Sequence, residues 1–370
     1  MNTLIAVVAR GLEDVAAKEI RALGGGIGKT RKDRGRVFFQ GPADAVYRAN
    51  LQLRTVDRVL VPLGDKPFEA TSSLALTRAA REMAWEEWVT PGQTLRVAAS
   101  AKACRLYHTG AIADAIKEAL VYRGIPTEEE GDQPVTVDLR GTADRWTLAV
   151  DSSGPSLHRR GYRKATAMAP LKETFAAAAL LKVGYTGEEP LLDPMCGSGT
   201  FVGEAALIAS RRPPGLDRSF AFENWPSFDP EMWQKVVGRV GGAMRPLPAA
   251  VEGADSAATA VKAAKGNLRR AEVDGVRILK RRIQDTPPAK GPGIVIMNPP
   301  YGKRVGPGTA IDAARGEWRA WANLLRERRP DAQIYALSPA EVLAEAAGAI
   351  GRPVLRFSNG GIPVALVKLQ

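Results

Sequence analysis

Before about residue 170, short apolar runs alternate with segments whose apolar residues recur every three to four positions. Over the first 60 residues, runs typical of strands alternate with segments typical of helices, at 4–8, 12–23, 37–39, 43–53 and 59–61. This order predicts a small unit that combines helices with a sheet. A basic run at 29–34 falls between two of these elements, and such runs are more often solvated turns than contacts to nucleic-acid phosphates.

A second stretch of alternating elements covers residues 61–153. Its strand-like and helical segments lie at 73–88, 95–98, 109–122, 135–139 and 146–150. Three cations and one aromatic residue gather near the start of its second helix, namely Lys102, Arg105, Tyr107 and Lys117. They form either a phosphate site or an ordinary set of surface cations at a helix entry, and the residues alone do not rank the two.

From residue 170 onward, helical segments alternate with short apolar runs. After a helix at 171–182, strand-like runs follow near 190–193, 249–252, 276–280, 293–297, 332–337, 353–358 and 362–369. This alternation is typical of an α/β fold in which helices cover both faces of a mostly parallel sheet. In such sheets, ligands bind at the carboxyl ends of the strands.

Length and charge narrow the classes of protein. A chain of 370 residues suits two or three domains. Lys and Arg number 52 against 40 Asp and Glu, and the net charge of +12 favours a polyanionic partner such as nucleic acid. Cys104 and Cys196 form no Cys-x-x-Cys pattern, which argues against a structural metal site and fits a reducing cytoplasm. The first ten residues have neither a basic region nor an apolar run long enough for a signal peptide or a membrane span, so we expect a cytoplasmic protein.

A rigid polar tetrapeptide follows the strand-like run at 293–297. Its two prolines fix two φ angles and remove two backbone N–H groups, so the Asn298 amide and the Pro299 carbonyl can be held as a pair of acceptors. Such a pair suits a planar exocyclic amine, and Tyr301 adds a flat face on which a base could stack. The candidate catalytic residues are therefore Asn298, Pro299, Pro300 and Tyr301. The alternative is a turn that merely ends a strand.

A glycine-rich loop about a hundred residues upstream strengthens the catalytic interpretation. Residues 191–201 read as a strand, a tight glycine loop and a helix start, and Thr200 could help to cap that helix. A phosphate-binding P-loop would need Gly-Lys-Ser/Thr, and the loop has no Lys. The spacing Gly197-x-Gly199 followed by Val202-Gly203 also departs from the dinucleotide pattern Gly-x-Gly-x-x-Gly. The loop therefore points to a nucleotide-like ligand without a pyrophosphate.

These two motifs together resemble the class I S-adenosylmethionine-dependent methyltransferases that modify exocyclic amines. More closely, the chain resembles the THUMP-domain RNA methyltransferases, in particular the large-subunit rRNA guanine-N2 methyltransferases of the RlmL type. The resemblance extends to 157–163, to 169–174 and to Trp225, Phe228 and Trp233, and it covers nearly the whole chain.

The resemblance implies a fold for each part of the chain. Residues 1–60 would form a ferredoxin-like domain, and 61–153 a THUMP domain that binds RNA. A basic linker at 154–169 would follow. Residues 170–370 would form a Rossmann-like class I methyltransferase domain with a seven-stranded, mostly parallel sheet. Its cofactor would be S-adenosylmethionine, and neither a metal nor a membrane would take part.

The resemblance also assigns site residues. A carboxylate just beyond the second strand of the sheet, Asp255, can accept hydrogen bonds from both ribose hydroxyls, although NAD enzymes use the same device. The expected cofactor-binding residues are Asp193, Pro194, Met195, Cys196, Gly197, Gly199, Thr200, Asp255, Asp285 and Asn298. The expected RNA-binding residues are Arg159, Arg160, Arg163, Lys303 and Arg304. About forty residues inserted at 210–249 carry aromatic residues, which we interpret as local packing rather than as a border of the substrate cleft.

The expected reaction is methyl transfer to the N2 of a guanosine in large-subunit rRNA. A tRNA guanosine-N2 methyltransferase would use the same machinery. A DNA adenine-N6 methyltransferase shares Asn298-Pro299-Pro300-Tyr301 but would not need the amino-terminal RNA module. An RNA-binding protein with a decayed methyltransferase domain is the non-enzymatic alternative, and the intact motifs argue against it.

Overall fold

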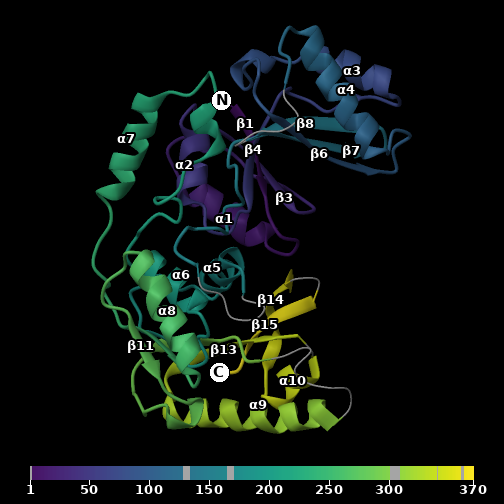
Figure 1. Cartoon of the computed structure of the whole chain (residues 1–370). Helices are drawn as coiled ribbons and strands as arrows, with labels where there is room; N and C mark the ends of the chain where they lie inside the picture. Colours follow the sequence, from purple (N-terminus) through teal and green to yellow (C-terminus); the bar gives the residue numbers. More distant parts are fainter. Residues whose placement is uncertain (1, 128–133, 165–170, 301–308, 340, 360–361) are drawn as a thin grey trace. The chain divides into compact units, whose positions relative to one another are not determined.

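The chain forms two compact units, each of which is assembled from separate segments of the sequence. The computed structural model describes all residues except 1, 128–133, 165–170, 301–308, 340 and 360–361 (Figure 1). The first unit comprises Met1–Val8, Ala17–Leu157 and Arg218–Val237, and the second comprises Ala9–Ala16, His158–Asp217 and Gly238–Gln370. Over the described residues, no helix has the length and apolar character that a membrane crossing requires.

The first unit is built on one sheet of eight strands. Their order is β2-β3-β1-β4-β8-β7-β6, and β5 pairs with β8 off this path. The strands are β1 (Asn2–Val7), β2 (Arg31–Asp33), β3 (Arg36–Gly41), β4 (Arg58–Pro62), β5 (Phe68–Glu69), β6 (Leu95–Lys102), β7 (Val135–Thr142) and β8 (Arg145–Asp151). The strands β4 and β8 pair antiparallel, with Leu60 opposite Asp151. The parts predicted at 1–60 and 61–153 therefore share a continuous sheet.

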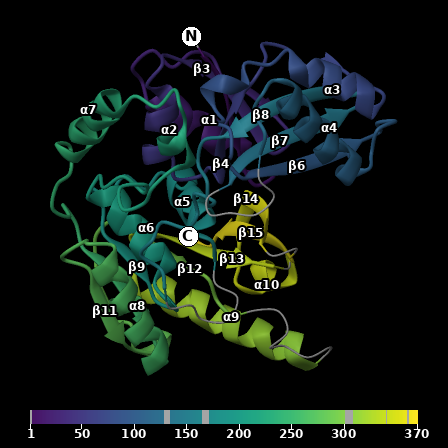
Figure 2. The ribbon, with the colours of Figure 1, turned by 45° about the horizontal axis from the view of Figure 1, so that its top comes forward.

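Four α-helices accompany this sheet in the described part of the unit before residue 157, and Figure 2 shows two of them, α3 and α4, alongside β6 and β7. The helices are α1 (Glu13–Ala22), α2 (Ala45–Gln52), α3 (Ser73–Arg81) and α4 (Thr109–Tyr122). The helix predicted at 73–88 ends at Arg81, and a 3₁₀ turn, η1 (Trp85–Glu87), follows. There the buried Trp85 donates its indole N–H to the Ala80 carbonyl at 2.7 Å, which turns the chain back on the helix end.

The basic run at 29–34 forms part of a hairpin and not only a turn. Arg31–Asp33 is strand β2, which pairs antiparallel with β3, with Arg31 opposite Phe38. All three residues of β2 are exposed, so no apolar alternation marks the strand in the sequence. Backbone pairing with β3 rather than side-chain burial holds it in place.

The first unit also contains residues 218–237, which the sequence places in the middle of the methyltransferase part. They form a 3₁₀ turn, η2 (Ala221–Asn224), and the start of α7 (Pro230–Gly241). The ring of Phe222 lies 4.7 Å from that of Tyr47 and 5.3 Å from that of Trp233, and Trp225 lies 4.7 Å from Trp88. The aromatic residues of the insert pack on one another, as expected, and they also pack against Tyr47 and Trp88 of the first unit.

The second unit is a seven-stranded sheet in the order β11-β10-β9-β12-β13-β15-β14. Its strands are β9 (Leu191–Asp193), β10 (Val251–Asp255), β11 (Arg277–Lys280), β12 (Gly293–Met297), β13 (Ala332–Ser338), β14 (Ile350–Asn359) and β15 (Ile362–Lys368). The first five strands pair in parallel, and β15 is antiparallel to both β13 and β14. This confirms the predicted α/β class and the seven-stranded, mostly parallel sheet.

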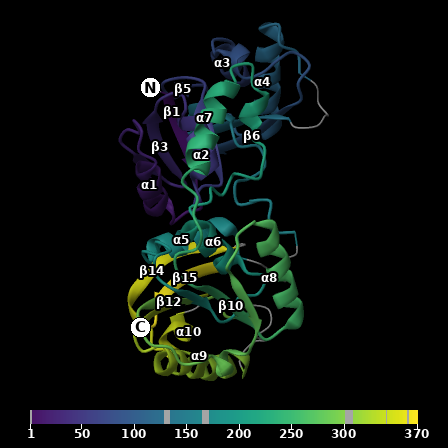
Figure 3. The same cartoon turned by 90° about the vertical axis from the view of Figure 1, so that its left-hand side faces the viewer.

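Helices cover both faces of this sheet (Figure 3). On one face lie α5 (Glu173–Lys182), α6 (Thr200–Ala209) and α8 (Ala258–Arg270), and on the other α9 (Thr309–Arg328) and α10 (Glu341–Ala346). Trp318 and Leu325 of α9 pack with Val295 of β12 and Ile334 of β13 in a buried cluster. The parallel strands are apolar along their whole length because both faces are covered in this way.

The aromatic cluster provides a test of how residues 218–237 are anchored. Phe222 is fully buried, so we expect Phe222→Ala to destabilise the first unit by about 3–5 kcal/mol through lost contacts and the cavity left behind. Lys235→Ala, on the exposed side of α7, should change stability by less than about 0.5 kcal/mol. Urea unfolding followed by tryptophan fluorescence measures both, and equal midpoints would contradict the assigned role of the cluster.

Candidate active site

The site begins where β9 ends, at a buried carboxyl group. Asp193 is 1% exposed, and its Oδ1 accepts the backbone N–H of Met195 at 3.1 Å. Burial, with a smaller contribution from the charge of Asp255, raises the pKa of Asp193 to about 8, although the Met195 hydrogen bond acts in the opposite direction. This side-chain hydrogen bond to the backbone thus fixes the start of the loop.

The loop itself depends on two glycines with positive φ. Gly197 has φ +54° and Gly199 has φ +85°, and the Gly199 N–H donates to the Cys196 carbonyl at 2.8 Å. A Cβ at residue 199 would lie 3.1 Å from the Cβ of Ala264 on α8, closer than ordinary packing allows. The loop therefore keeps a left-handed turn and a close approach to α8 that only glycine tolerates.

Thr200 does not cap α6, contrary to expectation. The N-cap position belongs to Gly199, which has no side chain with which to accept a backbone N–H. Thr200 is the first residue of the helix, and its Oγ1 accepts a hydrogen bond from the Arg163 guanidinium at 3.2 Å. The first backbone N–H groups of α6 thus receive no side-chain cap and point toward the loop, an arrangement that suits a polar ligand group.

Cys196 is a buried residue of the loop. Burial, together with the charges of Asp193 and Asp255, raises the pKa of its thiol above the ordinary range. A thiol that resists ionisation is a poor nucleophile, so the structure agrees with Cys196 as a small packing residue.

Asp255 lies beside the glycine loop despite the long insert before it. Its Oδ2 accepts the Gly197 N–H at 2.9 Å and its Oδ1 accepts the Ala257 N–H at 2.9 Å. The position follows from strand pairing, since β10 is parallel to β9 with Gly253 opposite Asp193. The partly exposed carboxylate retains lone pairs for the two hydroxyls of a ribose, so its position fits the expected role.

Asp285 has a different environment. It ends the 3₁₀ turn η3 (Ile283–Asp285), is exposed, and its carboxylate lies 3.1 Å from the Arg282 guanidinium. Among the described residues, no hydrogen bond or ion pair joins its side chain to the glycine loop. Its adenine-binding role stays a prediction.

Asn298 follows β12, which lies between β9 and β13 in the sheet. Its Oδ1 is buried and has no hydrogen-bond partner among the residues that the structure describes. An unpaired buried amide oxygen is costly, and a ligand N–H would satisfy it. Pro299 is buried and Pro300 exposed, whereas Tyr301, Lys303 and Arg304 lie outside the described residues.

Three of the arginines expected to bind RNA differ in their surroundings. Arg159 is exposed. Arg160 is 3% exposed and lies 3.4 Å from Glu204 in α6, and the Arg163 guanidinium lies 3.1 Å from Glu173 in α5. The charges of Arg160 and Arg163 are thus compensated inside the unit, which argues against their expected phosphate contacts.

Sequence reasoning missed the acidic partners of these arginines. Glu204 is fully buried in α6, where the Tyr162 hydroxyl also donates to its Oε1 at 3.1 Å. A lone carboxylate within the otherwise apolar run 200–209 was the available signal, because a buried charge requires a partner. Burial raises the pKa of Glu173 to about 7, although the Arg163 charge acts in the opposite direction.

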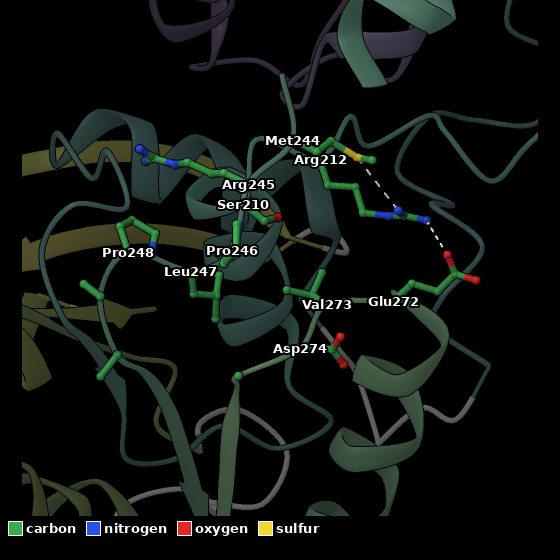
Figure 4. A pocket seen from close by; sticks show the side chains of 13 residues that line it. Ser210, Arg212, Met244, Arg245, Pro246, Leu247, Pro248, Glu272, Val273 and Asp274 are labelled. Atoms are coloured by element: carbon green, nitrogen blue, oxygen red, sulfur yellow. Dashed lines mark hydrogen bonds and ion pairs between the residues drawn. The ribbon is translucent and has the colours of Figure 1, made fainter. Parts of the chain in front are cut away.

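A cavity of about 810 Å³ lies near the amino ends of the parallel strands β10 and β11 (Figure 4). It is lined by 244–250, which lead into β10, by 272–275, which lead into β11, and by Ser210 and Arg212. Arg212 forms ion pairs with Asp217 at 2.7 Å and Glu272 at 2.9 Å. Because this cavity lies where the parallel strands begin, it is separate from the glycine loop at their ends.

The residues at the strand ends fit S-adenosylmethionine. The glycine loop permits close approach of a ligand, and Asp255 can accept from ribose hydroxyls. Asn298 Oδ1, which has no partner in the described part of the chain, can accept from a ligand N–H. In the described residues, no cluster of three or more His, Cys, Asp or Glu side chains is placed to hold a metal ion.

The raised pKa of Glu173 predicts a pH dependence of stability. Between pH 4.5 and 7 the folded protein binds the Glu173 proton more tightly than the unfolded chain does, so this stabilisation is complete below about pH 4.5 and is lost as pH rises through about 7. Glu173→Gln removes it, so the wild-type Tm should fall roughly 4–8 °C more than that of the variant between pH 5 and 8. Thermal unfolding by differential scanning fluorimetry measures this, with the exposed Glu345→Gln as a control that should follow the wild type. Parallel curves for wild type and Glu173→Gln would contradict the assignment.

Three family models match consecutive parts of the chain. The model described as RMKL-like, methyltransferase domain matches residues 160–346, the RlmL ferredoxin-like domain matches 3–60, and the THUMP domain matches 70–151.

Known proteins resemble the chain over almost its full length. A Synechocystis protein named "Putative RNA methyltransferase slr0064" is 33% identical over 99% of this chain and 96% of that protein. The crystal structure of SMU.472, described as a putative methyltransferase complexed with SAH, is 28% identical with a TM-score of 0.88, covering 99% of this chain and 97% of that one. A structure from Listeria monocytogenes, described as a predicted N6-adenine-specific DNA methylase, is 29% identical with a TM-score of 0.86, covering 99% and 95%.

The predicted fold class, the resemblance and the cofactor are confirmed by these matches together with the seven-stranded sheet. The chain belongs to the RMKL-like methyltransferase family, with an RlmL-type ferredoxin-like part and a THUMP part before a domain that uses S-adenosylmethionine.

Proposed function

We propose that the protein transfers a methyl group from S-adenosylmethionine to the exocyclic N2 of a guanosine in large-subunit rRNA. The observation that carries the proposal is the buried Oδ1 of Asn298 at the end of β12, which has no hydrogen-bond partner among the described residues. It lies one strand away from the glycine loop that follows β9. Acceptor and cofactor loop thus come from neighbouring strand ends.

The two acceptors explain how a weak nucleophile could be activated. The lone pair of guanine N2 is delocalised into the ring, and positive charge develops on the nitrogen as the new bond forms. Hydrogen bonds from the two amino protons to Asn298 Oδ1 and the Pro299 carbonyl would orient the amine and stabilise that charge. S-adenosylmethionine supplies an already activated methyl group, so the protein need provide neither a metal nor a strong base.

The cofactor would lie on the loop after β9. We propose that Asp193, Pro194, Met195, Cys196 and the glycines at 197 and 199 shape its binding surface, that Thr200 begins the helix beneath it, and that Asp255 accepts from the ribose. Asp285 would accept from the adenine amino group, and Asn298 would face both ligands. The hydrogen bonds of Asp255 to the loop support this arrangement.

An RNA acceptor is supported by the THUMP match at 70–151 and by the net charge of +12. The target nucleotide has to leave its stack to reach a pocket at the strand ends, which favours a loop, a bulge or a remodelled helix. Tyr301 would stack on the base, and Lys303, Arg304 and Arg159 would contact phosphates. Since Arg160 and Arg163 form buried ion pairs, we assign them to the scaffold.

Two further acceptors share this chemistry. A tRNA guanosine would be methylated by the same residues, and the RlmL ferredoxin-like match at 3–60 supports rRNA over tRNA. An adenine N6 in DNA would also fit an Asn-Pro-Pro-Tyr site, and the Listeria monocytogenes relative carries such a description. The THUMP part favours RNA over DNA.

Substitutions at Asn298 test the acceptor role. We expect Asn298→Ala to lower kcat for methyl transfer by about 10²–10³, since one preorganised hydrogen bond to the reacting nitrogen is lost. Asn298→Asp retains an acceptor oxygen and should retain more activity. Labelled S-adenosylmethionine, total RNA and nucleoside digestion identify the product, while Tm verifies folding.

The location of the label separates the acceptors. N2-methylguanosine in large-subunit rRNA that disappears in Asn298→Ala agrees with the proposal. The same nucleoside in tRNA would identify tRNA as the substrate in place of rRNA. N6-methyladenine in DNA would overturn the proposal. Unchanged rates in Asn298→Ala would remove Asn298 from the mechanism.

A pair of glycine substitutions tests the cofactor loop. Gly199→Ala forces a side chain into a left-handed conformation and against Ala264, so we expect the Kd for S-adenosylhomocysteine to rise at least about tenfold. Gly266→Ala on α8 meets no atom closer than 3.6 Å and should bind as the wild type does. Isothermal titration calorimetry measures both. Equal affinities would place the ligand away from this loop.

A further inference from the structure

Strand register in the first unit separates its sheet into a helix-covered face and an open face. Successive side chains of a strand point to opposite faces, and paired residues share a face. On β6, Leu95 and Val97 share the face of the buried Val135 and Val137 of β7, against which α4 packs. The alternate positions of these strands therefore belong to the open face.

The open face of β6, β7 and β8 is basic. Its positions hold Arg96, Ala98, Ser100 and Lys102 on β6, Thr136, Asp138, Arg140 and Thr142 on β7, and Arg145 and Thr147 on β8. We call Arg96, Lys102, Arg140 and Arg145 the basic sheet patch. Three of its members, Arg96, Lys102 and Arg145, are exposed. The two carboxylates that these strands place on this face, Asp138 and Asp151, are already ion-paired with Arg36 and Arg58.

A second region contributes cations to the same face. Arg36 of β3 forms its ion pair with Asp138 of β7, although three strands separate β3 from β7 in the sheet. In a flat sheet the two strands would lie roughly 19 Å apart, four strand spacings, which two side chains cannot bridge. The sheet must therefore curl toward its open face.

The curl brings the β2–β3 hairpin to the basic sheet patch. The Arg140 guanidinium donates to the Arg34 carbonyl at 3.4 Å. In the same hairpin, the guanidinium of the exposed Arg31 lies 4.0 Å over the ring of Phe38, so its position is restricted before any ligand binds. Cations that are fixed beforehand lose less entropy when they pair with a phosphate.

The side chains between these cations indicate the form of the nucleic acid. Ala98, Ser100, Thr136, Thr142 and Thr147 are small, and four of them carry hydroxyls that can bond phosphates or ribose. No aromatic side chain occupies the open-face positions of β6, β7 and β8, so unstacked bases would find no ring to stack on there. A curled surface of short side chains with cations at its margins fits the backbone of helical RNA.

The helix-covered side of the unit differs in its charge pairing. There Arg81 pairs with Glu118 at 2.9 Å, and Arg123 pairs with Glu86. Arg105, near the start of α4, has Asp144 at 3.5 Å. By contrast, no ion pair engages Arg96, Lys102 or Arg145 within the described ranges.

We propose that the basic sheet patch docks the phosphate backbone of a double-helical RNA segment, independently of its sequence. The inference rests on the proposed function, because it takes RNA as the substrate. The docking surface and the methylation site belong to different units, so docking would determine which structured RNA is retained. Base identity would be read only at the strand-end site of the second unit.

Salt-dependent binding tests the proposal on the full-length protein. The probe is a synthetic RNA duplex of about 20 base pairs, labelled at one end, with a single-stranded RNA of equal length as comparison. The triple variant Arg96→Ala/Lys102→Ala/Arg145→Ala should bind the duplex with a log K against log salt slope less steep by about two to three. Its affinity at 0.1 M salt should fall roughly five- to tenfold for each phosphate contact removed.

Matched controls separate this face from general charge. Lys18→Ala on α1 and Arg78→Ala on α3 remove exposed cations from helices and should leave the slope unchanged. The variant Arg96→Lys/Arg145→Lys should restore most of the affinity, since both charges remain. Circular dichroism melting confirms that each variant is folded.

Three outcomes would overturn the inference. They are an unchanged slope in the triple variant, equal losses in the helix-side controls, and tighter binding of the single strand than of the duplex. Asn298→Ala, which removes the methyl-acceptor contact, should bind the duplex with the wild-type slope. If Asn298→Ala abolishes methylation of RNA while the triple variant binds normally, the docking surface is wrong and the proposed function stands. If the wild type neither binds RNA nor methylates it, the proposed function itself fails.

Discussion

The pairing of β9 with both β10 and β12 is the constraint on which the candidate active site depends. The three strands run parallel, so their carboxyl ends lie at one edge of the sheet. This single arrangement brings together the glycine loop at 193–200, Asp255 and Asn298, which are far apart in the chain. The backbone hydrogen bonds from Gly197 and Ala257 to Asp255 then hold the loop against the end of β10.

Buried ion pairs provide the second layer of support. Arg160 with Glu204 and Arg163 with Glu173 link the segment after residue 157 to the helices α5 and α6. Because Arg163 also donates to Thr200, the first residue of α6, the network reaches the cofactor loop. Removing one partner from such a pair leaves an uncompensated charge in the interior. These residues therefore stabilise the fold rather than bind a ligand.

The first unit shows how one sheet can serve two modules. The ferredoxin-like and THUMP parts meet at the β4–β8 pairing, where Ile5, Leu60 and Ala149 form a buried cluster. A segment from the middle of the methyltransferase sequence, 218–237, completes the core of this unit through Phe222 and Tyr47. The two modules and the inserted segment thus share one hydrophobic core, although residues 158–217 of the second unit separate them in the sequence.

Local patterns in the sequence determined most elements of both sheets, because strand and helix periodicity depends on near neighbours. The residue types at 193–200 and 298–301 likewise pointed to the candidate cofactor and acceptor motifs. Other features required the tertiary structure. Only strand order placed Asp255 beside Gly197, only burial converted Arg160 and Arg163 from expected RNA contacts into ion-paired residues, and only backbone pairing revealed the exposed strand β2. Each depends on partners distant in sequence, and a charged residue reads the same in a sequence whether water or a buried carboxylate surrounds it.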